Sequence, residues 1–396
     1  MEHNKTIGVF FGSRSTEHDI SIITAQLIIS GLKGLALSVV PVYINREGYW
    51  LINEELGKLE NFTDPQREIG KENAYKQYYL DLENSIGKIV FKKKGLSGKT
   101  IIIDLAFPAF HGAFGEDGTI QGLFEMLNVP YVGCDVTSSA IAMDKALTKQ
   151  MCQIHNIPTT KFIYFYKKEW EENKEAILNK IKGELSWPVF VKPVHLGSSI
   201  GIAKVKDKDI KELENKIEVA FYYDNKVLIE EEVANLMDVT CCIIGNEKLQ
   251  ASLLQESVFK ADLFDFEEKY LKEGGGQFGK SQSSVIIPAR INQNLTNKIQ
   301  EAAKEVYKAL GCSGIARVDF LLNKANNEFF ANEVNPLPGT LYHHLWKESG
   351  MEFPELLKKL VSFAGERHSQ KQNFNYSFQS SVLNSINSKK LKFKKS

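Results

Sequence analysis

A predicted β-hairpin over residues 315–335, two apolar runs around a polar turn, constrains the fold more than any other feature. Its first strand carries Arg317 and Asp319, and its second strand carries Glu333 and Asn335. Residues two positions apart leave the same face of a strand, so these polar groups can share one surface. Two carboxylates and an amide oxygen on a rigid surface suit a hard cation such as Mg²⁺ better than zinc. The alternative, a solvated hairpin with scattered acids, fits poorly with the apolar residues around them.

The size and charge of the chain limit what it can be. A chain of 396 residues exceeds one compact core and predicts two or three domains. Lys plus Arg and Asp plus Glu both number 49, so no overall field favours nucleic acid or an anionic membrane. The amino terminus resembles no secretory signal, and no apolar run approaches a membrane span.

The cysteines point to a reducing compartment. None of the five belongs to a CxxC pair, so we expect buried thiols in a cytoplasmic protein rather than a metal site or a disulfide framework. The five are Cys134, Cys152, Cys241, Cys242 and Cys312.

The first 43 residues predict the class of the amino-terminal part. A strand at residues 6–12, a helix after Ser15 and a strand at residues 37–43 form a βαβ unit, which predicts a parallel sheet covered by helices. An antiparallel excursion is expected near residues 78–91. From residue 367 the composition shifts to Gln, Asn, Ser and Lys, which predicts a disordered basic tail over residues 367–396.

A small-residue loop follows a buried strand that ends in Lys192. Gly197 and Gly201 let the backbone approach a ligand, and the amides and hydroxyls of Ser198 and Ser199 can surround phosphate oxygens. A tight turn between strands would be the better interpretation without Lys192. A lysine at the end of a buried strand, however, needs an anion nearby.

Two further segments are weaker signals on their own. Lys145 begins a helix and is a candidate second phosphate ligand, although lysines on helices are usually solvated. Residues 229–233 end a strand and can present backbone groups and a carboxylate to an adenine edge.

Taken in order, these segments resemble the D-alanine–D-alanine ligase family of ATP-grasp enzymes. The resemblance covers about residues 6–365, and the order and spacing of its modest motifs make it specific. The motifs lie at residues 17–21, 111–118, 143–145, 192–199, 269–270, 316–319 and 332–335.

The resemblance implies an α/β and α+β fold in a three-domain ATP-grasp architecture with an N-terminal parallel α/β domain. The expected parts are a substrate-binding domain at 1–133, a central ATP-grasp subdomain at 134–230, a C-terminal ATP-grasp subdomain at 231–366, and the tail. The implied reaction joins two D-alanines through an acyl phosphate, with release of ADP and phosphate, for peptidoglycan precursor synthesis. A cytoplasmic homodimer acting on small amino acids is expected.

The resemblance also assigns residues. The ATP-binding residues are Lys145, Lys192, Gly197, Ser198, Ser199, Glu230, Glu231, Val233 and Asp238. Two Mg²⁺ ions, with Mn²⁺ as a substitute, are assigned to Asp319, Glu333 and Asn335. The catalytic residues are Glu17, Ser198, Tyr270, Arg317 and Gly339. The amino-acid substrates are assigned to Glu17, His111, Lys269, Tyr270, Arg317, Gly339, His344 and Leu345.

Residues 257–284 are expected to form a lid that excludes water from the acyl phosphate. By similarity, Tyr270 and Ser198 hydrogen-bond with Glu17 when such a lid closes. A tyrosine at this position favours peptide-forming over ester-forming members of the family.

The chain departs from the family pattern in its lid and at two sites. The lid has a Gly-rich segment, with Lys280 after it. Asp238 replaces a ribose-binding glutamate and is one methylene shorter. After Asn335, His344 or its neighbour takes the place of a serine near the carboxylate of the second amino acid. A histidine can bind a carboxylate. The alternative interpretation is that Tyr342, His343 and Trp346 only pack the following helix.

Two alternatives therefore stay open. The first is the same chemistry with a different acceptor, such as D-serine or an L- or β-amino acid. The second is a non-catalytic ATP-grasp module that binds nucleotide, although such a module has no need of a second metal-binding carboxylate.

Overall fold

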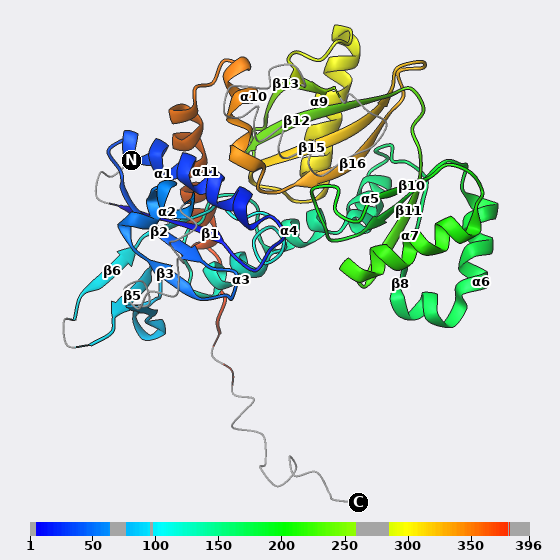
Figure 1. Ribbon diagram of the computed structural model, residues 1–396. Coiled ribbons are helices and arrows are strands. Elements are labelled where there is room, and N and C mark those ends of the chain that lie inside the picture. Colours follow the sequence, from blue (N-terminus) through cyan, green and yellow to red (C-terminus); the bar gives the residue numbers. More distant parts are fainter. Residues whose placement is uncertain (1–4, 64–76, 96–97, 259–284, 379, 381–396) are drawn as a thin grey trace, which may run out of the picture.

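The computed structural model describes residues 5–63, 77–95, 98–258, 285–378 and 380. Within this part, four sheets and their helices form an elongated molecule with the amino-terminal sheet at one end (Figure 1).

The amino-terminal sheet has the strand order β3-β2-β1-β7. Strands β1 (Thr6–Gly12), β2 (Ser38–Ile44) and β7 (Leu105–Pro108) are parallel, and β3 (Trp50–Ile52) is antiparallel to β2. Helix α1 (His18–Gly34) makes the connection from β1 to β2, as the βαβ pattern predicted. The short elements η1 (Glu54–Gly57) and α2 (Glu60–Thr63) follow β3.

A small antiparallel sheet confirms the excursion expected near residues 78–91. It consists of β4 (Tyr78–Leu80), β5 (Ile89–Lys93) and β6 (Thr100–Ile103), with η2 (Leu82–Asn84) between β4 and β5. Helix α3 (Thr119–Met126) leads from β7 toward the centre of the chain.

The central sheet has the order β10-β9-β11-β8 and its neighbouring strands are antiparallel. Helices α4 (Val136–Met143) and α5 (Lys145–Ile154) precede it. Its elements are β8 (Phe162–Tyr166), α6 (Lys167–Glu184), β9 (Val189–Pro193), β10 (Ala203–Val205), α7 (Ile210–Tyr223) and β11 (Lys226–Glu231).

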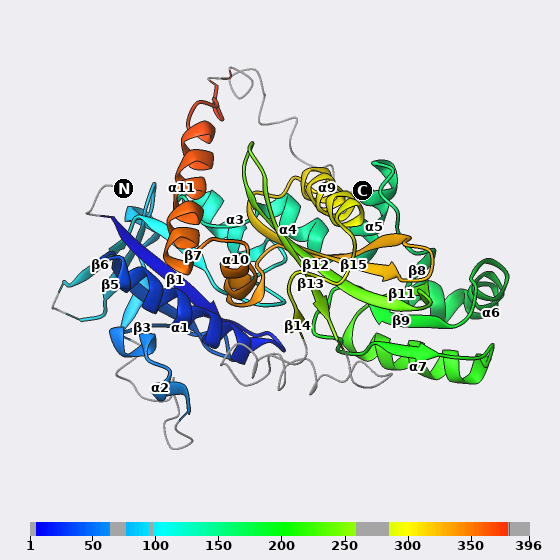
Figure 2. The same ribbon diagram turned by 90° about the horizontal axis from the view of Figure 1, so that it is seen from above.

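The carboxy-terminal sheet has the order β14-β13-β12-β15-β16 and is also antiparallel. Its elements are β12 (Leu236–Gly245), β13 (Gln250–Ser257), β14 (Val285–Ile286), α9 (Gln293–Ala309), β15 (Gly314–Asn323) and β16 (Phe329–Asn335). Strands β15 and β16 form the predicted hairpin, in which Asp319 pairs with Glu333 and Arg317 with Asn335. Viewed from above, this sheet lies beside the central sheet (Figure 2).

The last elements return the chain to the amino-terminal sheet. They are η4 (Gly339–Tyr342), α10 (His343–Glu348) and α11 (Phe353–Lys371). Helix α11 packs against α1, where a Cβ on Gly31 would lie 2.5 Å from Leu357 Cδ1. One hydrophobic core contains Phe107, Ile315 and Trp346, so the first and last parts of the chain share a core. The predicted domain boundaries at residues 133 and 230 therefore remain a prediction.

The expected start of the tail at residue 367 is wrong. Helix α11 continues to Lys371, and Arg367 on this helix binds groups on other elements. Its guanidinium donates to the Tyr131 carbonyl at 2.9 Å and also to the Gly133 carbonyl and the Ser313 hydroxyl. Residues 381–396 lie outside the described part of the chain.

All five cysteines are buried free thiols, as expected. None of the helices in the described part of the chain combines the length and the apolar character needed to cross a bilayer.

We expect Arg367→Ala to lower the free energy of unfolding by about 2 kcal/mol, because three oxygen acceptors lose a charged donor. Lys359→Ala is the matched control, since Lys359 lies on the same helix and pairs with Glu355 near solvent. Thermal and urea unfolding of both variants measure the difference, and equal stability would show that Arg367 does not anchor α11.

Candidate active site

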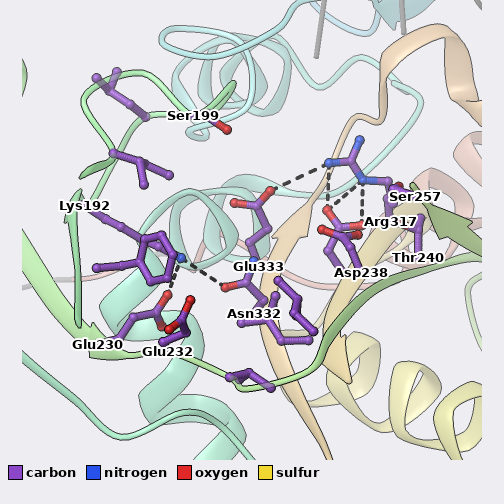
Figure 3. A pocket seen from close by; sticks show the side chains of 18 of the residues that line it. Lys192, Ser199, Glu230, Glu232, Asp238, Thr240, Ser257, Arg317, Asn332 and Glu333 are labelled. Carbon is purple, nitrogen blue, oxygen red and sulfur yellow. Dashed lines mark hydrogen bonds and ion pairs between the residues drawn. The ribbon is translucent and has the colours of Figure 1, made fainter. Parts of the chain in front are cut away.

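Two cavities adjoin where the three larger sheets meet. The first, of about 900 Å³, lies between the central and carboxy-terminal sheets (Figure 3). The second, of about 910 Å³, extends toward the amino-terminal sheet. Both cavities are lined by Leu196, Gly197, Arg317, Glu333 and Tyr342.

The hairpin places its polar groups around the Arg317 guanidinium. Arg317 donates to Asp319 through Nε at 2.9 Å and through a terminal nitrogen at 2.8 Å, and lies 3.8 Å from Glu333 Oε1. Asn335 Nδ2 lies 3.2 Å from Asp319 Oδ2, and Lys145 Nζ lies 3.5 Å from Glu333 Oε2. The predicted cluster is thus assembled, and its two carboxylates are neutralised by an arginine and a lysine.

This donor set fits a magnesium ion. Among the described residues, no group of three or more His, Cys, Asp or Glu side chains gathers as a metal site. The hairpin instead offers two carboxylates that pair across its strands and an amide beside Asp319, and Mg²⁺ typically takes one or two carboxylates with phosphate oxygens and water.

A buried ion network fixes Lys192 in the first cavity (Figure 3). Its ammonium group is paired with Glu230, which also accepts from Lys149 Nζ at 2.8 Å and from the Thr160 hydroxyl at 2.7 Å. Burial alone would raise the pKa of Glu230, but Lys149 and Lys192 hold that pKa well below its usual range. Glu230 is therefore ionised and oriented before any ligand enters.

Sequence reasoning missed Lys149, which is 1% exposed on α5. Lys149 follows Lys145 by four residues, so both lie on one face of that helix. This spacing is the signal that was available.

The small-residue loop turns its backbone toward the junction of the cavities. Ser198 and Ser199 adopt left-handed φ angles of 60° and 57°, and the Ser198 hydroxyl donates to Glu17. A Cβ on Gly197 would lie 3.1 Å from Glu17 Oε2, so glycine permits this close approach. Lys145 Nζ donates to the Leu196 carbonyl at 2.6 Å and supports the loop.

The second cavity contains Glu17, His111 and Glu116. Glu17 precedes the first turn of α1 without a side-chain capping bond. The His111 Nε2 atom lies 2.8 Å from Thr24 Oγ1, and burial followed by the charge of Arg317 lowers the pKa of His111 to about 3. His111 is therefore neutral near pH 7.

Sequence reasoning gave no role to Glu116, although its motif was recognised. Burial, followed by the charge of Glu17, raises the pKa of Glu116 to about 8. Its Oε2 atom accepts from the Gly112 amide at 2.7 Å. This buried acid places a second titratable carboxyl in the cavity that contains Glu17.

Four other predicted ATP-binding residues line the first cavity: Ser199, Glu231, Val233 and Asp238. Glu231 Oε1 accepts from the Ser186 amide at 2.8 Å. Gly339 lines the second cavity.

The structure corrects the assignments of His344 and Leu345. As far as the described residues form them, the walls of both cavities include neither residue. Leu345 is fully buried in the core, while His344 Nε2 lies 2.7 Å from Gln255 Oε1. Burial lowers the pKa of His344 to about 4, so it carries no charge with which to bind a carboxylate near pH 7. Lys269, Tyr270 and the expected lid, from residue 259 onward, lie outside the described residues.

Comparisons with known proteins match this arrangement. Residues 6–134 match the family model described as "D-ala D-ala ligase N-terminus", and residues 151–362 match "D-ala D-ala ligase C-terminus". This chain belongs to the D-alanine–D-alanine ligase family. The recognition from sequence and the ATP-grasp fold class are thereby confirmed.

Relatives of this family member match it along nearly their whole length. A D-alanine–D-alanine ligase of Caldicellulosiruptor bescii is 37% identical, over 94% of this chain and 98% of the relative. The structure of the D-alanine–D-alanine ligase from Coxiella burnetii has a TM-score of 0.78 and 28% identity, over 93% of this chain and 96% of the other. VanG D-Ala:D-Ser ligase from Enterococcus faecalis has a TM-score of 0.75 and 33% identity, over 91% and 99%.

A charged network surrounds His195, directly before the small-residue loop. His195 Nδ1 lies 3.0 Å from Asp224 and its Nε2 lies 3.3 Å from Asp144. Asp144 also accepts from Lys226 Nζ at 2.7 Å. Hydrogen bonds to Asp144 and Asp224 raise the pKa of His195 to about 9.

We expect His195→Gln to reduce the alkaline sensitivity of the fold. A histidine whose folded pKa is raised stabilises fully below its unfolded pKa of about 6.5, and this contribution is lost as pH rises through about 9. The melting temperature of the wild type should therefore fall more between pH 6 and pH 10 than that of the variant. Parallel curves would show that protonated His195 adds no stability. His155→Gln, at the C-cap of α5, is the control.

Proposed function

We propose that this chain is an ATP-dependent ligase that joins two D-alanines for peptidoglycan precursor synthesis. The reaction converts ATP and two D-alanines to D-alanyl-D-alanine, ADP and phosphate. The observation that carries the proposal is the pair of adjoining cavities that share Arg317, Glu333 and Gly197. One cavity has the charge pattern of a nucleotide site, and the other has buried acids suited to an ammonium group.

The nucleotide side supplies positive charge and backbone donors. Lys145, Lys192 and the loop from Gly197 to Ser199 would receive the phosphates, while Glu230 and the backbone at Glu231 and Val233 would receive adenine. Asp238 would face the ribose. Phosphoryl transfer depends mainly on positioning and charge neutralisation, which such groups provide.

Magnesium, when bound to Asp319, Glu333 and Asn335, would neutralise phosphate oxygens and align the nucleotide. Arg317 and Lys145, which both lie beside Glu333, would then be fixed cations next to the transferred phosphoryl group.

The amino-acid side completes the reaction. Glu17 would hold the ammonium group of the first D-alanine. The carboxylate of that D-alanine attacks the γ-phosphate of ATP, and ADP leaves. The amine of the second D-alanine then attacks the acyl phosphate, and phosphate leaves. Arg317 and the Gly339 amide would stabilise the oxyanion that forms in this second step. Neutral His111 would contact the same substrate without repelling its ammonium group.

A second candidate uses D-serine as the acceptor. It is favoured by the likeness to VanG D-Ala:D-Ser ligase, which is 33% identical over 91% of this chain. The reaction sequence would be the same.

Mass spectrometry of the product formed from ATP and a pool of amino acids separates these proposals. D-alanyl-D-alanine as the main product supports the first, and a D-alanyl-D-serine product supports the second. Failure to release phosphate with any amino acid would contradict both. The expected homodimer stays a prediction, which analytical ultracentrifugation measures.

We expect Arg317→Ala to lower kcat by about 10² to 10³, because it removes charge stabilisation made in the transition state. The Kd for ATP should stay within about threefold, since the other phosphate ligands remain. Arg46→Ala is the control, because Arg46 forms an exposed pair with Asp19 and lines neither cavity as far as the described residues form them. An unchanged kcat in Arg317→Ala would contradict the assigned role.

We expect Gly112→Ala to raise the KM for D-alanine about tenfold through misplacement of Glu17. Gly112 has a φ of 72°, and a Cβ there would lie 2.7 Å from Glu17 Oε2 and 2.6 Å from Ser15 Oγ. Gly122→Ala is the matched control, because Gly122 lies within α3 with no atom within 4 Å of the added methyl. Steady-state kinetics with ATP saturating measure both, and equal KM values would mean that Glu17 does not bind the substrate.

A further inference from the structure

Three consecutive residues without a glycine adopt left-handed backbone angles directly after Gly339. The φ angles of Thr340, Leu341 and Tyr342 are 47°, 56° and 47°. Single residues visit this region, but a run of three is exceptional for L-amino acids with a Cβ. Such a conformation persists only where surrounding contacts hold it in place, and such strained residues cluster at functional sites.

The first two residues of the turn are anchored in the core. The Thr340 amide donates to Thr24 Oγ1 at 3.0 Å, and the same oxygen lies 2.8 Å from His111. Leu341 is fully buried beside residues of α1 and α10. The turn is thus fixed beside the second cavity, and its third residue, Tyr342, lies at the cavity wall.

Tyr342 lies where the two cavities meet. It lines both of them and is the aromatic residue among the five that they share. The Arg317 guanidinium carbon lies over the Tyr342 ring, 4.9 Å from its centre. The His344 ring lies 4.9 Å from the Tyr342 ring and is held by Gln255, so the tyrosine is supported from a second side.

The other partners of Arg317 have a competing task. Asp319 binds Arg317 through both oxygens, and Glu333 lies 3.8 Å from it. These are the two carboxylates of the donor set that fits magnesium. A carboxylate shared with a divalent ion holds an arginine less firmly, whereas an aromatic face attracts the guanidinium without a formal charge.

We propose that Tyr342 is a positioning residue that keeps Arg317 at the junction of the cavities when Asp319 and Glu333 bind metal. The inference rests on the proposed ligase function. The strained turn thereby places one aromatic face beside the transferred phosphoryl group. Packing of α10 alone is the competing explanation, and it requires only an apolar side chain of similar size.

Two substitutions separate these explanations. Tyr342→Phe keeps the aromatic face, whereas Tyr342→Leu keeps an apolar bulk without it. The backbone should accept leucine, because Leu341 already adopts a φ of 56° in the same turn. Tyr222→Leu is the control, since Tyr222 is 85% exposed on α7.

We expect Tyr342→Leu to lower kcat about tenfold, with the KM for ATP within about twofold, as loss of a desolvated cation–π contact would produce. Tyr342→Phe and Tyr222→Leu should stay within about twofold of the wild type. A binding measurement without turnover adds a second readout, using ADP, Mg²⁺ and aluminium fluoride as a mimic of the transferred phosphoryl group. Tyr342→Leu should weaken this complex about tenfold and leave the binding of ADP alone unchanged.

Equal activity and binding in Tyr342→Leu and the wild type would overturn the inference. An equal loss in Tyr342→Phe and Tyr342→Leu would also overturn it, since the ring face would then be irrelevant. If Tyr342→Leu fails to fold, Tyr342→His replaces it, because histidine retains a ring face. The kcat of Tyr342→His is then compared with that of Tyr342→Phe. A loss of more than tenfold in a well-folded Tyr342→His variant contradicts the role. A wild type that releases no phosphate with any amino acid refutes the proposed function instead, and the aluminium fluoride measurement still tests Tyr342.

Discussion

The pairing of Arg317 with Asp319 and Glu333 is the interaction on which the site depends. Two carboxylates facing each other on neighbouring strands would repel, and the guanidinium between them removes that repulsion. Lys145 adds a second cation, 3.5 Å from Glu333, from a different element of the chain. The hairpin therefore presents oxygen ligands that are already ordered, and a divalent ion would find its donors in place at the cost of loosening these ion pairs.

The same principle governs the first cavity, the proposed nucleotide site. Glu230 is buried with two lysines, one of which, Lys192, reaches the cavity while the other, Lys149, is enclosed in α5. Removing one member would leave an uncompensated buried charge, which is costly. Charges of opposite sign thus alternate from the buried Lys149 through Glu230 to Lys192 at the cavity. The Lys192 ammonium group is therefore held in a fixed direction for an anionic ligand.

In the second cavity, the proposed amino-acid site, burial favours uncharged groups. His111 is held neutral, and the pKa of Glu116 is raised to about 8 by its enclosure and by Glu17. Close approach of backbone at Gly112 and Gly197 leaves Glu17 within reach of the Ser198 hydroxyl. Glu17 is thereby fixed in position, and we propose that it receives the ammonium group of the first substrate.

The sequence by itself determined the elements that local pattern encodes. Alternating apolar residues predicted the hairpin of β15 and β16, the βαβ start predicted the parallel sheet, and ordered motifs predicted the family. The two-residue spacing of Glu333 and Asn335 was sufficient to place them on one face, because strand geometry fixes it. Only the tertiary structure decided which side chains meet across long separations. Lys149 on the buried α5 pairs with Glu230, and His344 lies against Gln255 instead of a cavity. Arg367 on α11 binds the carbonyls of Tyr131 and Gly133. The left-handed turn that brings Tyr342 to Arg317 has no glycine at residues 340–342, so no local sequence pattern predicts it. Contacts with the core stabilise its strained backbone.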